Sequence, residues 1–335
     1  MSAGAAVKGR ADQLFKAGVE ASVADARSQS AQVTPNPWLE RLGCRATDRV
    51  VVLHADDLGM THETFGAVED WLDAGLTFSA SVMAPCPWFR EAIAFARRHP
   101  KLDLGVHATL NAEWEGYRWR PVSTVDPRSG LMDRHGYMHT KSRVAMRTIG
   151  AMAGIRELVA QFRMVRDAGI RPSHLDVHMG TPFHPKFMPG YLGLALRNRL
   201  PAFVPRLSPA NLERVSGGSL TKTAFTRIFR WLETRMPLFD GMIGMPLDNQ
   251  PRGVAEATRI LGALGPGLWH VFIHPARDSV ALRSFCRSWR SRVADWKTFS
   301  TPAFRQWARG SGIRFLRYAD LRRAMSRNGK RTFVI

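Results

Sequence analysis

Cysteine is scarce in this sequence. Its 335 residues include three cysteines, Cys44, Cys86 and Cys286, which lie far apart and form no CxxC pair. This pattern argues against a disulfide framework and against a zinc site built from thiolates. It is also typical of proteins in a reducing compartment.

Long apolar stretches are absent as well. The sequence contains no run of eighteen apolar residues, so no transmembrane helix is predicted. The first residues, MSAGAAVKGRADQLFKAG, lack the apolar centre of a secretory signal. We therefore expect a cytoplasmic location.

Acidic residues are outnumbered by basic ones. Lys and Arg number 48 against 28 Asp and Glu, a formal net charge of +20, and such a surface attracts nucleic acid, anionic lipid or anionic polysaccharide. No recognised nucleic-acid motif accompanies the charge, so we expect no nucleic-acid partner; an arginine-rich composition also arises in GC-rich genomes. Residues 219–236 predict a basic amphipathic helix. Packing against the core is the favoured explanation of that helix, and peripheral membrane contact stays open.

Apolar residues make up 45% of the chain. Short runs of β-branched residues, typical of strands, alternate along the sequence with segments whose apolar residues recur at the period of a helix. This alternation predicts an α/β fold with a largely parallel sheet in one catalytic domain, 48–327. An N-terminal extension, 1–47, is expected to be partly disordered or helical, and 328–335 form a tail. Residues 111–150 predict a long insertion of the kind that forms functional loops. Strands are expected at 50–55, 78–84, 102–107, 174–178, 202–207, 268–274 and 313–318, and helices at 63–74, 87–98, 155–168, 186–199, 219–236, 254–264, 279–309 and 319–327.

Polar side chains that can bind metal stand at four of the expected strand ends. They are Asp56 and Asp57 on the first, His107 on the third, the trio His174, Asp176 and His178 on the fourth, and His274 on the sixth. The carboxyl ends of parallel strands meet at one edge of a sheet or barrel, so these side chains are expected to assemble there. Within the trio, each step of two residues advances about 7 Å. We therefore expect one ligand, His178, which lies nearest the strand end, while His174 and Asp176 lie behind the metal ligands or support the strand.

One carboxylate and two imidazoles leave positions open for water and substrate, as in a catalytic metal site. The same set occurs in iron oxygenases, so the ligand types alone do not name a reaction. Asp56 and His274 are suited to be the base and the acid of a hydrolysis. Because adjacent strand residues point to opposite faces, Asp56 and Asp57 are expected to make different contacts.

Four motifs in order, His-Ala-Asp-Asp-Leu-Gly, Gly-Val-His-Ala-Thr-Leu, His-Leu-Asp-Val-His and Ile-His-Pro, resemble those of the YdjC-like (ChbG-type) carbohydrate deacetylases over residues 48–325. The resemblance implies a distorted TIM-like (β/α) barrel and metal-dependent removal of an acetyl group from a sugar. It implies that Asp57, His107 and His178 bind one divalent ion, zinc or magnesium, and that Asp56 is the general base. By analogy with polysaccharide deacetylases, His274 is the general acid.

The sequence departs from the family pattern at DDLG, where the family commonly has DDFG, and at Met179-Gly180-Thr181-Pro182-Phe183-His184 after the fourth strand. The insertion and the extension depart from it as well. The acetylated carbohydrate or glycolipid substrate is therefore open, as is a homodimer. Two alternatives remain: another metal-dependent hydrolase (amidohydrolase or phosphoesterase), or a basic non-catalytic protein that binds nucleic acid or a membrane surface. Six further histidines have no evident partner and are interpreted as structural or exposed: His54, His62, His135, His139, His184 and His270.

Overall fold

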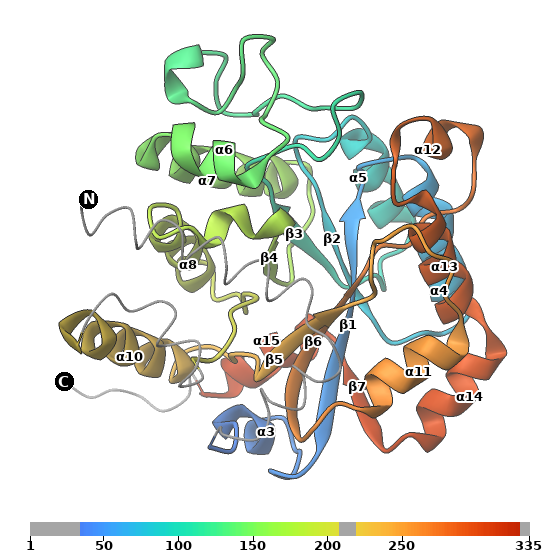
Figure 1. Ribbon diagram of the computed structural model, residues 1–335. Helices are drawn as coiled ribbons and strands as arrows, with labels where there is room; N and C mark the ends of the chain where they lie inside the picture. The colour runs from blue at the N-terminus through green and yellow to red at the C-terminus, as the bar shows by residue number, and fades with distance from the viewer. Residues whose placement is uncertain (1–33, 208–218, 329–335) are drawn as a thin grey trace.

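Seven parallel strands form the centre of the molecule in the computed structural model, which describes residues 34–207 and 219–328. The sheet order is β4-β3-β2-β1-β6-β5, and β7 pairs with β1. The sheet curls into a half-barrel (Figure 1). Single bridges from Leu175 to Ala202 and from Pro205 to Phe239 link its two edges. This confirms the predicted distorted TIM-like barrel. The strands are β1 (Arg49–Leu58), β2 (Ser79–Val82), β3 (Leu104–Ala108), β4 (Leu175–Val177), β5 (Gly241–Gly244), β6 (Gly267–Ile273) and β7 (Ile313–Leu316).

Strand β1 is the axis of the sheet because it has three neighbours. Strand β6 pairs with it from Arg49 to Ala55, while β7 pairs with its first half and β2 with its second half, from His54 onward. Its run of Val50, Val51 and Val52 is fully buried, as expected for a parallel strand covered on both faces. The end of β1 is therefore fixed from both sides.

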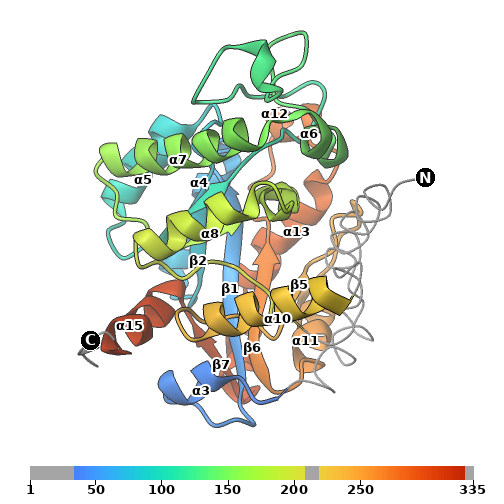
Figure 2. The same ribbon diagram turned by 90° about the vertical axis from the view of Figure 1, so that its left-hand side faces the viewer.

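Helices surround the outside of this half-barrel. Figures 1 and 2 show α7 and α8 on one side and α4 and α13 on the other. No helix of the described residues combines the length and apolarity that a membrane crossing requires. The longer helices are α4 (Glu63–Asp73), α5 (Phe89–Arg98), α7 (Ala151–Asp167), α8 (Met188–Arg197), α10 (Ser219–Glu233), α11 (Val254–Gly262), α13 (Trp289–Ser300), α14 (Pro302–Gly310) and α15 (Tyr318–Asn328). The shorter ones are α3 (Pro37–Arg41), α6 (Ser142–Thr148), α12 (Val280–Phe285) and the 3₁₀ turns η1 (Pro127–Ser129) and η2 (His178–Phe183).

The structure differs from the predicted elements in three places. The strand expected at 202–207 makes only single bridges. Strand β5 was not predicted, because its end glycines, Gly241 and Gly244, are poor strand formers. They are needed because a Cβ there would meet the rings of Trp269 and Phe272 at 2.3 and 2.0 Å. The single helix expected at 279–309 is three helices, the last begun by Pro302 behind a Thr301 cap.

The insertion, residues 111–150, lies over the carboxyl end of the strands, at the top of Figure 1. It is irregular apart from η1 and α6, as predicted. Its first part is held by aromatic contacts to α12: the Tyr117 ring stacks on Phe285 at 4.2 Å, and Trp114 lies 5.4 Å from the same ring. The insertion therefore forms a packed cover beside the strand ends.

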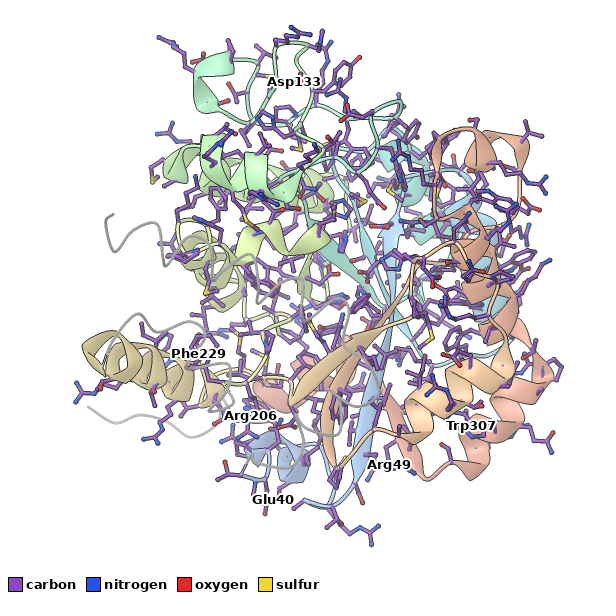
Figure 3. The ribbon with its side chains drawn as sticks, in the orientation of Figure 1. Glu40, Arg49, Asp133, Arg206, Phe229 and Trp307 are labelled. Atoms are coloured by element: carbon purple, nitrogen blue, oxygen red, sulfur yellow. The ribbon has the colours of Figure 1, made fainter. Side chains whose placement is uncertain are left out.

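At the opposite end of the barrel, the buried Arg206 connects α10 to the segment before β5. Figure 3 labels it low in the view, far from Asp133 of the insertion. The Arg206 guanidinium donates to Glu233 at the end of α10 and to Asp240 before β5. Trp38 of α3 is buried and donates its indole N–H to the Glu233 carbonyl. Part of the predicted extension thus packs against the barrel, whereas residues 1–33, and 329–335 of the predicted tail, lie outside the described residues.

Candidate metal centre and catalytic site

The end of β1 carries a β-bulge at its two aspartates. Ala55 pairs with Ala80 and Leu58 with Val82, so β1 has one residue more than β2 between these pairs. Asp57 takes a left-handed conformation with φ of 65°, which is uncommon for a residue other than glycine. The bulge breaks the strict alternation of the strand. Both carboxylates therefore lie near His274, whose Nε2 is 3.9 Å from Asp56 Oδ2 and 4.0 Å from Asp57 Oδ2.

The three predicted metal ligands come together. Asp57 Oδ1 lies 3.3 Å from His107 Nε2 and 3.3 Å from His178 Nδ1. The three side chains come from the ends of β1, β3 and β4, and all are buried. Asp57 Oδ1 has no hydrogen-bond partner, and neither does His178 Nε2. A buried carboxylate oxygen without a partner is costly, and these three side chains form one of the groups that could hold a metal ion.

The spacing of these atoms fits a divalent metal ion. Ligand atoms about 2.1 Å from a shared ion lie roughly 3.0–3.5 Å apart when they subtend 90–110°. The observed separations of 3.3 Å fall in that range. A mixed nitrogen and oxygen set suits zinc and also accommodates magnesium.

Arg292 of α13 lies against the other oxygen of Asp57. Its Nη1 donates to Asp57 Oδ2 at 2.8 Å, and its Nη2 lies 3.2 Å from a carboxylate oxygen of Glu113 in the insertion. Burial alone would raise the pKa of Asp57, but the guanidinium and His178 hold that pKa well below its usual range. Arg292 thus favours the ionised form of Asp57 and binds Oδ2, so Oδ1 is the oxygen that faces the two imidazole nitrogens. No sequence pattern pointed to this role, since Arg292 is one of 48 basic residues.

Asp176 supports the ligand His107. The two residues are direct neighbours across β3 and β4, and Asp176 Oδ2 lies 2.6 Å from His107 Nδ1. Ser81 also donates to Asp176 Oδ2. Burial raises the pKa of Asp176, but the neighbouring His107 and His54 lower it overall. An ionised Asp176 holds a proton on Nδ1 of His107 and so leaves Nε2 to face Asp57, as in carboxylate–histidine–metal arrangements.

His274 follows the last residue of β6. Its backbone N–H donates to Asp295 Oδ2 at 3.0 Å, and its Nδ1 has no partner. Burial lowers the pKa of His274 to about 4, so the ring is neutral near pH 7. Burial also raises the pKa of Asp295 to about 7. A neutral His274 must gain a proton before it can donate one.

His174 does not join the three ligands. Its Nε2 lies 2.7 Å from His54 Nε2, and its ring stacks on Tyr318 at 3.9 Å. His54 also contacts Asp56, and His270 contacts the Tyr318 hydroxyl. The partners of His54 and His270 were not evident in the sequence because they come from other parts of the chain, and both rings are buried. Within the described residues, no metal-competent cluster includes His62, His135, His139 or His184.

Comparisons with known proteins match this chain to one family. A family model described as YdjC-like protein matches residues 50–310. A carbohydrate deacetylase of Thermus thermophilus is 32% identical over 271 residues, which cover 80% of this chain and 92% of the relative. A carbohydrate deacetylase of Thermoanaerobacter pseudethanolicus is 23% identical over 82% of this chain and all of its own length. A crystal structure from Enterococcus faecalis, described as a candidate cellobiose-phosphate cleavage protein, shares the fold with a TM-score of 0.64 and 19% identity, covering 82% of this chain and 99% of its own.

Proposed function

Because the chain belongs to the YdjC-like family, we propose that it is a metal-dependent carbohydrate deacetylase acting on an N-acetylated sugar or glycoconjugate. One observation carries the proposal: Asp57 Oδ1, without a hydrogen-bond partner, faces two imidazole nitrogens at 3.3 Å, with Asp56 and His274 alongside. The two relatives named carbohydrate deacetylases support the reaction class.

Asp57, His107 and His178 would hold one divalent ion, zinc or magnesium. Such an ion supplies Lewis-acid activation of water and of an amide carbonyl. Arg292 and Asp176 hold two of these ligands in place through Asp57 Oδ2 and His107 Nδ1. The protein thus contributes proposed ligands that are held in position, with Asp57 in its ionised form.

Asp56 is the general base in this proposal. Its side chain is 11% exposed, with Oδ1 bound to His54 and Oδ2 directed toward His274. Asp56 takes a proton from the attacking water as the water oxygen bonds to the acetyl carbon. That proton passes to the neutral His274 and then to the sugar nitrogen as the C–N bond breaks. The products are acetate and the free amine, and Asp56 and His274 return to their starting states.

Acetate release from purified full-length protein tests the proposal. The metal is removed with chelator and restored with zinc, magnesium, manganese or iron, and each form is given a panel of N-acetylated sugars and glycolipids. We expect metal-dependent release of acetate from at least one class. Release of phosphate or ammonia from matched substrates would favour the phosphoesterase or amidohydrolase alternative. Bound metal without turnover of any acetylated substrate would contradict the proposal.

The insertion lies beside the site, since its Glu113 contacts Arg292 and its Trp119 ring lies 5.9 Å from that of His178. In this proposal, residues of the insertion therefore help to determine which substrate reaches the site. For this reason the panel spans monosaccharides, oligosaccharides and glycolipids.

A further inference from the structure

A chain of hydrogen bonds runs from Asp56 into the barrel interior. Asp56 Oδ1 lies 2.5 Å from His54 Nδ1, and His54 Nε2 lies 2.7 Å from His174 Nε2. The chain ends at Ser173, whose hydroxyl lies 2.8 Å from His174 Nδ1. His54 and His174 are fully buried, and both nitrogens of each ring are engaged.

The chain has one consistent direction of donation when Asp56 is ionised. A carboxylate can only accept, so the proton between Asp56 and His54 sits on His54 Nδ1. Burial, with His54 nearby, lowers the pKa of His174 well below its usual value, so His174 carries one ring proton. Ser173 donates to His174 Nδ1, and His174 donates from Nε2 to His54 Nε2. Every donor then has an acceptor, and His54 is fixed as the tautomer that serves Asp56.

The His54 ring is also held by packing. It lies edge-on to His174 at 4.9 Å and to Tyr318 at 5.6 Å, and tilted against His270 at 5.0 Å. Its backbone is paired on both sides, with Ser79 of β2 and Phe272 of β6. A ring confined in this way gives Asp56 Oδ1 a fixed partner, while Oδ2 lies 3.9 Å from His274 Nε2.

We propose that His54 is a positioning residue that holds one oxygen of Asp56 through its Nδ1–H, so that the other oxygen faces the reacting water and His274. The inference rests on the proposed role of Asp56 as the base. Conduction of a proton through the interior is disfavoured, because burial lowers the pKa of both His174 and His270. The chain of hydrogen bonds orients Asp56 and sets the tautomer of His54; it does not carry a proton away from the site.

Substitution of His54 by asparagine or by glutamine distinguishes the role of Nδ1 from that of Nε2. The side-chain amide of asparagine places its N–H₂ near the position of Nδ1, and that of glutamine places it near Nε2. We expect His54→Asn to keep kcat within about threefold of wild type. We expect His54→Gln and His54→Ala to lose kcat by about 10–100-fold, the range typical of lost support for a reacting group. KM and metal content should be unchanged in all three, because His54 touches neither the substrate nor the three ligands.

Ser173→Ala provides a second variant that leaves the His54 ring intact. It removes the last donor of the chain, and we expect a smaller loss of kcat at constant KM. Thermal unfolding and metal content are measured for every variant. Equal loss in His54→Asn and His54→Gln, or full activity in His54→Ala, would overturn the inference. If the His54 variants do not fold, an unchanged kcat in Ser173→Ala would overturn it. Wild-type protein without deacetylase activity would instead contradict the proposed function.

Discussion

Two clusters of histidine and aspartate occupy the same barrel, one at the carboxyl ends of the strands and one in the interior. In the first, Asp57 Oδ1, His178 Nε2 and His274 Nδ1 have no hydrogen-bond partner. In the second, both nitrogens of His54 and His174 are engaged. The residue types are the same, but the first cluster holds three unpartnered atoms, whereas near His54 in the second only Asp176 Oδ1 lacks a partner among the described residues. The two clusters therefore differ in the number of unsatisfied atoms and not in composition.

The main chain explains the difference. In the interior, His54 still belongs to the regular pairing with β2 and β6, so its side chain meets partners from neighbouring strands. At the carboxyl ends, the bulge at Asp56 and Asp57 and the left-handed turn at Met179 and Gly180 end that regularity. Side chains there converge, with Asp57 Oδ1 3.3 Å from one nitrogen of His107 and 3.3 Å from one nitrogen of His178.

The largest effects are expected at the proposed base and at the proposed metal ligands of the first cluster. Asp56→Asn should retain metal but lose activity by about 10²–10⁴-fold, because it removes the general base. His107→Ala should lose both metal and activity. Metal analysis and acetate release measure the two variants, with the exposed His135→Ala as a control that should match wild type. An active Asp56→Asn would rule out its role as the base.

A pair of matched substitutions tests the comparison itself. His174→Phe should lower the free energy of unfolding by about 1–3 kcal/mol, because it leaves His54 and Ser173 without a buried partner. His178→Phe should cost less stability in chelator but abolish metal binding. Denaturant unfolding with and without metal measures both. The reverse outcome, with metal lost in His174→Phe and kept in His178→Phe, would interchange the roles of the two clusters.

Asp295 gives a smaller effect that depends on pH. Burial raises its pKa in the folded protein to about 7, from 3.8, although Arg292 and Arg252 oppose the shift. The folded state therefore binds a proton that the unfolded state releases between pH 4 and 7. The contribution of Asp295 to stability is full below pH 4 and is lost as pH rises toward 7, by at most about 1.4 kcal/mol per pH unit.

Asp295→Asn should remove this loss while it still accepts the His274 N–H. Thermal unfolding of both proteins at pH 5, 6 and 7 measures the difference, which should grow with pH in favour of the variant. A constant difference across this range would show that the buried carboxyl is not protonated.

The smallest effect is expected at the surface, outside both clusters. Ile228 and Trp231 of α10 are 49% and 45% exposed, and Arg235 lies over the Trp231 ring. Membrane contact through α10 remains a prediction, and α10 lies below the carboxyl ends of the strands in Figure 1. Membrane contact predicts weak, salt-sensitive flotation with anionic vesicles, reduced in Trp231→Ser, whereas the favoured packing of α10 against the core predicts none. The absence of flotation at low salt would remove the idea.

Much of the first cluster was predictable, because strand ends in a parallel sheet meet at one edge. The motifs placed Asp57, His107 and His178 there, and the structure brings them together. Arg292 and Glu113 could not be predicted, since α13 and the insertion are far apart in sequence and neither residue stands in a strand pattern. The interior network was hidden for a similar reason: the partner of His54 is His174, which lies 120 residues away, directly before β4.

The left-handed backbone of Asp57 places function and stability in opposition. A glycine would adopt this conformation without the roughly 1 kcal/mol that a side chain costs there. It would, however, remove the only carboxylate in contact with Arg292 Nη1 among the described residues. A glycine at position 57 would therefore leave Nη1 of the buried Arg292 without its carboxylate partner, and it would remove a proposed metal ligand. Attempts to make this protein more heat-resistant should leave position 57 unchanged and seek gains at the surface, where no such conflict exists.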